Sequence, residues 1–172
     1  MVVADEELGE WNCLETSLEY HAICEITGST TVPPPTAPTD LCGNNSNYVF
    51  VEELNRCLRT QPNPQLWNDA EAACEQDGAH LVSIHNQEAN DFLRRTALSN
   101  RFLGNVHIGA KVSSDLEAQW SDGSDFDYDN FHPGMPNSWF GDCVALETRE
   151  ILGTWANVEC DLISLPFFCF KP

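Results

Sequence analysis

Eight cysteines constrain this chain more than any other feature of its sequence. No two of them form a Cys-x-x-Cys pair, which disfavours zinc ribbons and thioredoxin-type redox sites. An even number of dispersed cysteines in 172 residues instead indicates a disulfide framework made in an oxidising compartment, and so predicts a secreted or extracellular protein. The cysteines are Cys13, Cys24, Cys42, Cys57, Cys74, Cys143, Cys160 and Cys169.

No segment near the N-terminus would direct the chain into that compartment. Met1 is followed by three apolar residues and then by the acidic residues 5–7, so a signal peptide is absent from this sequence. No stretch approaches the roughly 20 apolar residues of a membrane span, and we expect no membrane insertion. We therefore expect the sequence to be a fragment of a longer extracellular protein. The sequon at residues 44–46 agrees with a glycoprotein.

The chain is strongly acidic, with 27 Asp and Glu against 8 Lys and Arg and a net charge of −19. Nucleic acids and anionic membranes would repel it, so we predict no nucleic-acid partner. The acidity suits a cationic partner or bound calcium, or it only keeps the surface soluble. Hydrophobic residues make up 42% of the chain, which is enough for a packed core.

The composition divides the chain into three parts. Residues 28–40 are rich in Thr and Pro and predict an extended linker, either an O-glycosylated stalk or a bare spacer. Before the linker, the segment Leu8-Gly9-Glu10-Trp11 is followed by Cys24. The segment Leu152-Gly153-Thr154-Trp155 has the same Leu-Gly-x-Trp pattern and is followed by Cys169 at a similar spacing. This similarity arises by chance, or it marks residues 1–27 as the C-terminal remnant of a preceding copy of the domain at residues 41–172.

Within residues 41–172 the pattern predicts an α+β fold. Asn68 and Asp69 favour a helix start, Gly78 a helix end, and Asn86 the cap of a second helix over residues 87–98. Strands are expected at residues 48–51, 81–84, 106–110, 144–147 and 165–170. Residues 121–142 are rich in Asp, Gly, Asn and Pro and predict a long irregular loop, a kind of segment that is usually functional or disordered.

Several of these segments resemble the C-type lectin-like domain family. Residues 67–74 and 78–84 are similar to its first helix and the strand that follows, and His107-Ile108-Gly109-Ala110 resembles its Trp-Ile-Gly-Leu core strand with His in place of Trp. Segments within residues 119–131 and 141–169 resemble its long loop and its end. The resemblance covers residues 41–172 in the family's order. It implies the long form of the fold, with two helices flanking small antiparallel sheets.

The same resemblance implies a set of disulfides. Cys74 pairs with Cys169, Cys143 with Cys160, and Cys42 with Cys57 as the extra bridge of the long form. Cys13 and Cys24 have no other partners in this sequence, so they bond to each other or stay free, and we favour the bond.

Sugar-binding members of the family hold a calcium ion in the long loop, and this sequence departs from their ligand set. Met135-Pro136-Asn137 stands where they have Glu-Pro-Asn, Gly141 replaces a Glu, and Trp155-Ala156-Asn157 replaces Trp-Asn-Asp. Calcium requires six to eight oxygen ligands, and a thioether is a soft donor that does not suit it. We therefore expect the site to be degenerate, with calcium disfavoured and no other cofactor.

Two adjacent aromatic residues, Trp139 and Phe140, follow in the same loop. Exposed aromatics are typical contacts for protein ligands, and Trp also stacks on sugars. Alternatively they pack into the loop's own core, where alternation would bury only one of them. The residues we expect to contact a ligand are Asn137, Trp139, Phe140, Asp142 and Asn157.

Other binding and catalytic patterns fail. Residues 125–129 begin like an EF-hand loop, but Asn130 and Pro136 stand where Gly and Glu are needed, so these aspartates are turn formers or at most a weak cation site. No zinc-binding spacing of histidines and no catalytic triad is legible, so the chain is not expected to be an enzyme. We expect a secreted binding module for a glycan or an extracellular protein, or a structural module of a tandem-domain protein.

Overall fold

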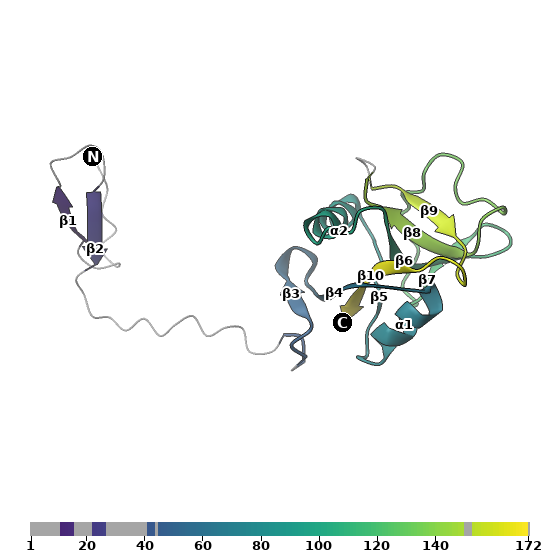
Figure 1. Ribbon diagram of the computed structural model, residues 1–172, viewed down its shortest axis with the longest axis horizontal. Helices are drawn as coiled ribbons and strands as arrows, with labels where there is room; N and C mark the ends of the chain where they lie inside the picture. Colours follow the sequence, from purple (N-terminus) through teal and green to yellow (C-terminus); the bar gives the residue numbers. More distant parts are fainter. Residues whose placement is uncertain (1–10, 16–21, 27–40, 44, 150–152, 172) are drawn as a thin grey trace. The chain divides into compact units, whose positions relative to one another are not determined.

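The computed structural model describes residues 11–15, 22–26, 41–43, 45–149 and 153–171 (Figure 1). The chain divides into two compact units, residues 1–39 and 40–172. The expected linker, residues 28–40, lies outside the described residues. Among the described residues, no helix has both the length and the apolar character needed to cross a bilayer.

The described residues of the first unit form one antiparallel strand pair. Strand β1 (Trp11–Glu15) pairs with β2 (Ala22–Ile26), and the register sets Cys13 opposite Cys24. This register suits the expected Cys13–Cys24 bond, which stays a prediction.

The second unit has the predicted α+β fold. Its helices are α1 (Trp67–Glu75) and α2 (Gln87–Ser99), with a 3-10 turn at Glu52–Leu54. Its strands join one sheet in the order β3-β4-β10-β6-β8-β9, with β5 on β10 and β7 on β6. All of these pairs are antiparallel except β10 with β6. The strands are β3 (Val49–Val51), β4 (Arg56–Gln65), β5 (His80–Leu81), β6 (Asn105–Val112), β7 (Ala118–Trp120), β8 (Cys143–Glu147), β9 (Trp155–Val158) and β10 (Leu165–Lys171).

Local sequence explains both helices. The Asn86 side chain caps α2 by accepting a hydrogen bond from the Ala89 backbone at 2.8 Å. Helix α1 begins at Trp67 without a side-chain cap, so the expected capping by Asn68 and Asp69 is wrong. Gly78 follows α1 with a φ of +69°, a left-handed conformation that glycine adopts without steric cost.

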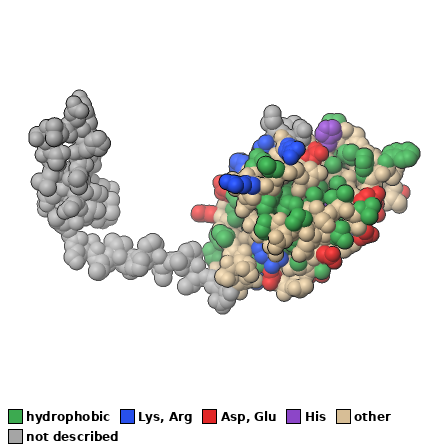
Figure 2. All heavy atoms as spheres, in the orientation of Figure 1, with side chains coloured by type: hydrophobic (Ala, Val, Ile, Leu, Met, Phe, Trp, Pro, Cys, Tyr) green, Lys and Arg blue, Asp and Glu red, His purple; other side chains and the backbone are tan. Residues whose placement is uncertain are grey.

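Two buried clusters lie on the sheet. Helix α2 packs Leu93 and Ala97 into one cluster, and α1 packs Trp67 and Ala70 into the other. Figure 1 shows strands of the sheet between the two helices. In the same orientation, Figure 2 shows blue Lys and Arg side chains gathering near α2.

Three disulfides are present among the described residues, and they are the pairs that the family resemblance implies. Cys74–Cys169 joins α1 to β10, Cys143–Cys160 joins β8 to the turn after β9, and Cys42–Cys57 joins the start of the unit to β4. The first closes a separation of 95 residues, and cross-linking so long a loop restricts the unfolded chain strongly.

His107 lies in the centre of β6 and is fully buried. Its Nε2 lies 3.1 Å from the backbone oxygen of Gln65. Burial lowers the pKa of His107 from 6.5 to about 4, against the opposing effect of the backbone contacts. Above pH 6.5 the imidazole is neutral in both states. As pH falls from 6.5 toward 4, the unfolded chain takes up a proton that the folded chain resists, so stability is lost over this window.

We expect acidification from pH 6.5 to 4 to remove about 3 kcal/mol of unfolding free energy through this one group. The His107→Phe variant lacks the titrating ring, so its free energy of unfolding should fall by about 3 kcal/mol less than that of wild type between pH 6.5 and 4. Urea unfolding at a series of pH values measures the difference, with His132→Phe at an exposed position as the control. Parallel pH profiles for wild type and His107→Phe would refute this account of His107.

Candidate functional site

The long loop between β7 and β8 is the irregular part of the domain, and aromatic contacts hold it in place. The indole of Trp155 on β9 is fully buried, and its Nε1 donates to Asn90 Oδ1 at 2.8 Å. Three loop rings meet it edge-on: Phe126, Tyr128 and Phe131, with centroids 6.2, 5.7 and 5.6 Å away. Burying these rings ties the loop to the core.

Backbone hydrogen bonds fix the same part of the loop. The Trp155 N–H donates to the Asn130 carbonyl at 2.9 Å, and the His132 N–H donates to the Trp155 carbonyl at 2.9 Å. Phe131 thereby forms an isolated parallel bridge with Trp155. Residues 130–132 thus act as a short extra strand beside β9.

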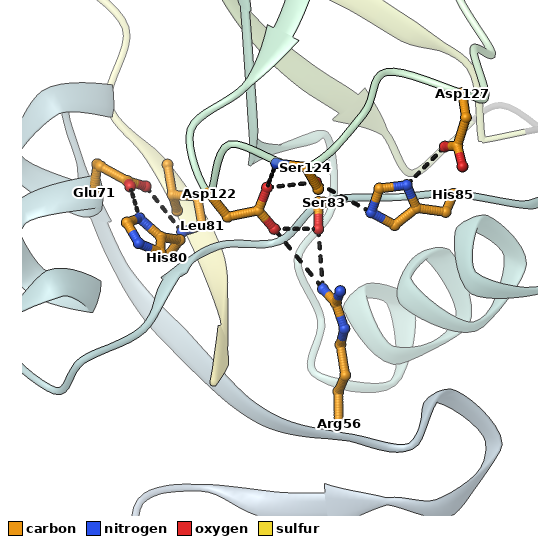
Figure 3. Close-up of polar contacts among 9 residues, drawn as sticks. All are labelled: Arg56, Glu71, His80, Leu81, Ser83, His85, Asp122, Ser124 and Asp127. Carbon is orange, nitrogen blue, oxygen red and sulfur yellow. Dashed lines mark hydrogen bonds and ion pairs between the residues drawn. The ribbon is translucent and has the colours of Figure 1, made fainter. Parts of the chain in front are cut away.

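A polar network anchors the start of the loop (Figure 3). The His85 ring bonds on one side to Asp127 at 2.7 Å and on the other to the Ser124 hydroxyl at 3.3 Å. The hydrogen bond from His85 lowers the pKa of Asp127. One of the expected turn-forming aspartates is therefore engaged by a histidine.

Asp122 completes this network. Burial opposes its ionisation, but hydrogen bonds from Ser124 and Ser83 and the charge of Arg56 outweigh that effect and hold its pKa below the usual value. Ser83 donates to Asp122 at 2.6 Å and accepts from Arg56 at 3.0 Å. A similar contact joins Glu71 of α1 to His80 of β5 at 2.6 Å.

Asn137 and Asn157, the two amides left at the expected calcium position, lie together. The Asn157 side chain is almost fully buried, and its Oδ1 accepts the Asn137 N–H at 3.1 Å. Its Nδ2 donates to the Asn137 carbonyl at 2.8 Å and to the Gly141 carbonyl at 2.7 Å. Asn137 Oδ1 in turn accepts the Trp139 N–H at 3.0 Å. Both side-chain oxygens thus bond to backbone N–H groups.

The other positions of the expected cage offer no charged oxygen. The Met135–Pro136 peptide is cis, and Met135 Sδ lies 3.3 Å from Asn137 Nδ2. A Cβ placed on Gly141 would lie 2.4 Å from the Glu159 Cα, so a glutamate does not fit there without a backbone shift. Ala156 is buried in β9. The Asp142 side chain is exposed, while its carbonyl accepts the Val112 N–H at 2.7 Å.

Trp139 and Phe140 both reach solvent. Trp139 is 89% exposed and Phe140 is 50% exposed, so the interpretation that both rings pack into the loop's own core is wrong. Of the expected ligand-contacting residues, Trp139, Phe140 and Asp142 are exposed, whereas Asn157 is buried and bonds to the Asn137 backbone.

A groove of about 380 Å³ opens beside this loop, and the sequence patterns did not identify it. Its apolar wall joins the turn between β6 and β7 to the long loop, and Asp129 and His132 add polar groups. Because the turn and the loop are separate in sequence, no spacing pattern links them. The apolar lining residues are Leu116, Ala118, Phe126, Phe131, Pro133, Met135 and Pro136.

Comparison with known proteins identifies the family. Residues 63–171 match the model of the lectin C-type domain. The chain is 34% identical over 106 residues to human lymphocyte antigen 75, covering 62% of this chain and 6% of that protein. It is 27% identical over 177 residues to human C-type mannose receptor 2, covering 99% of this chain and 12% of that protein. The chain therefore spans a small part of either relative.

Solved structures share the fold. A calcium-independent type II antifreeze protein aligns with a TM-score of 0.63 and 25% identity, covering 74% of this chain and 92% of that one. The family model spans more than half of the chain and takes in both helices and the long loop. The chain therefore belongs to the C-type lectin domain family, whose members are binding proteins of the carbohydrate-binding type and not enzymes.

Proposed function

We propose that residues 41–172 form an extracellular module that binds a glycan or protein ligand through residues 135–142, without calcium at Asn137 and Asn157. The observation that carries this proposal is the state of the Asn157 amide. Its oxygen and its nitrogen are both bonded to the loop backbone at Asn137 and Gly141, the two sides of the exposed Trp139 in the sequence. The loop is therefore held in shape by hydrogen bonds within the protein.

The chemistry of the position argues against calcium. A calcium ion would need several oxygens at ~2.3–2.6 Å, and charged ones among them. Here Met135 offers a thioether, Gly141 has no room for a side chain, and Ala156 offers no ligand. The Asn137 and Asn157 side-chain oxygens are uncharged, and each already accepts a backbone N–H, which leaves one lone pair on each for an ion. A structural relative described as calcium-independent supports the view that this fold can dispense with the ion.

The exposed aromatics supply the contact surface. Trp139 presents a large flat ring at low conformational cost, which suits stacking on a sugar or insertion into a protein surface. Such a surface on a supported loop is partly preorganised, so little ordering entropy is lost on binding.

A second candidate role is that of a structural module in a tandem-domain protein, with residues 1–27 as the remnant of a preceding copy and residues 28–40 as a linker. Strand β1 begins at Trp11 and β2 contains Cys24, just as β9 begins at Trp155 and β10 contains Cys169. The hairpin differs in that β1 pairs with β2, whereas β9 and β10 are not neighbours in the sheet. The alignment of 99% of the chain with a much longer receptor supports this role.

We expect Trp139→Ala to weaken ligand binding by at least tenfold, because an aromatic anchor at the centre of a contact contributes about 2 kcal/mol. Its melting temperature should not change, since the side chain is 89% exposed. Glycan and extracellular-protein arrays, each run with calcium and with chelator, provide the measurement. Leu103→Ala, at an exposed position in the turn after α2, is the matched control. Binding that disappears with chelator would contradict the proposal.

We expect Asn157→Asp to lower the free energy of unfolding by about 2–4 kcal/mol, because a buried carboxylate cannot donate to the carbonyls of Asn137 and Gly141. Millimolar calcium should not restore the loss, and chemical denaturation with and without calcium measures it. Asn63→Asp makes the same change at an exposed position and should be near neutral. If calcium restored the stability of Asn157→Asp, the loop would still be able to coordinate the ion, and the proposal would be contradicted.

A further inference from the structure

We propose that the groove lined by Leu116 and Phe131 binds a basic, apolar peptide segment of a protein partner. An aliphatic or aromatic side chain would occupy the groove, and a neighbouring Lys or Arg would pair with the carboxylates around it. This inference rests on the proposed function, in which the long loop is the ligand-binding face, and it adds the class of ligand.

The groove has the size and lining of a side-chain pocket. It is open to solvent and has a volume of about 380 Å³, and seven of its ten lining residues are Leu, Ala, Phe, Met or Pro. Within the described residues it is formed by the β6–β7 turn on one side and the loop from Phe126 to Pro136 on the other. An open groove with apolar side chains beside polar groups can take one side chain of a peptide ligand while the rest of the peptide lies on the surface.

The groove does not depend on the ligand for its shape. Its wall at Phe131 and His132 is fixed to β9 by two backbone hydrogen bonds of 2.9 Å with Trp155. Phe126 and Phe131 stack on each other at 6.5 Å and both contact the Trp155 ring. A preformed wall of this kind reduces the entropy lost on binding.

Leu116 gives a second sign that the groove is used. It stands at the tip of the β6–β7 turn with a φ of +63°, a left-handed conformation that is unfavourable for a leucine. The side chain lines the groove and is 43% exposed. A strained backbone that holds an apolar side chain in solvent is typical of binding loops.

Charge identifies the ligand class. No Lys or Arg occurs between Val112 and Thr148, whereas this stretch has eight acidic residues. Asp129 lines the groove itself, and Asp115 and Glu117 flank Leu116 as exposed residues. Red side chains lie among green ones on the right of the domain in Figure 2. The eight are Asp115, Glu117, Asp122, Asp125, Asp127, Asp129, Asp142 and Glu147. Arg56 pairs with Asp122 and His85 bonds to Asp127, so the charge at the groove comes from Asp115, Glu117 and Asp129.

Such a surface favours a cationic ligand and disfavours the alternatives. Sulfated and sialylated glycans would be repelled by the carboxylates. A neutral sugar would gain nothing from the excess of negative charge and would leave an apolar groove poorly filled. A peptide that combines Lys or Arg with Leu or Phe satisfies both the charge and the groove, and electrostatic attraction would speed its association.

The test uses the full chain and an array of short synthetic peptides in which basic and apolar content vary independently, together with a glycan array. Peptides that carry both features should bind. Raising NaCl from about 0.05 M to about 0.5 M should lower their affinity, because the electrostatic screening length shortens several-fold. The Leu116→Ala variant should bind these peptides about tenfold more weakly than wild type. The Asp129→Asn variant should bind them about threefold more weakly. Asp129→Lys should shift the preference toward acidic peptides.

Controls separate this inference from the proposed function. Leu103→Ala and Glu52→Gln change exposed residues that do not line the groove and should bind as wild type. If Trp139→Ala abolishes binding while Leu116→Ala and Asp129→Asn have no effect, the groove inference is overturned and the proposed function stands. Binding to glycans but to no peptide overturns it as well. If neither array binds, both proposals fall.

Discussion

Strand β9 holds the long loop against the domain at two points, and the shape of the surface depends on both. Trp155 supplies the apolar contact, because its buried ring gathers Phe126, Tyr128 and Phe131. Two residues further on, Asn157 supplies the polar contact, because its amide bonds to the backbone of the following part of the loop. A strand that is itself paired with β8 in the sheet thus extends its order to a segment without regular structure.

We propose that this arrangement does the work of the calcium ion that sugar-binding members of the family hold in the loop. An ion in the loop would both shape it and contact the ligand. In this chain the neutral amide of Asn157 shapes the loop instead of an ion. Burying such an amide costs less free energy than burying a charge, provided that the hydrogen bonds of the amide are made. We propose that exposed side chains contact the ligand: Trp139 and Phe140 on the loop, and the groove between the loop and the β6–β7 turn at Leu116. The carboxylates of the loop then act on a ligand rather than on a metal.

Much of the fold followed from local sequence, while the site did not. The helix of residues 87–98 was predictable because Asn86 is a side-chain cap followed by apolar residues on one face. Strand β4 was missed because its ten residues include two prolines and few apolar positions, and its order comes from pairing with β3 and β10. The hydrogen bonds of Asn157 could not be predicted from the sequence either. Its partners are backbone groups, which every residue has, so no residue type marks them. The groove depends on the turn at Leu116, whose backbone conformation is atypical for leucine.

The central claim is that the amide of Asn157, and not a metal, fixes the loop. Hydrogen exchange of the Asn137 backbone N–H tests it most directly, because this group donates to Asn157 Oδ1 at 3.1 Å. Our account predicts that the Asn137 amide is protected in chelator and that adding calcium leaves its exchange rate unchanged. Fast exchange in chelator that becomes slow when calcium is added would contradict the account, because the ion would then be what orders the loop.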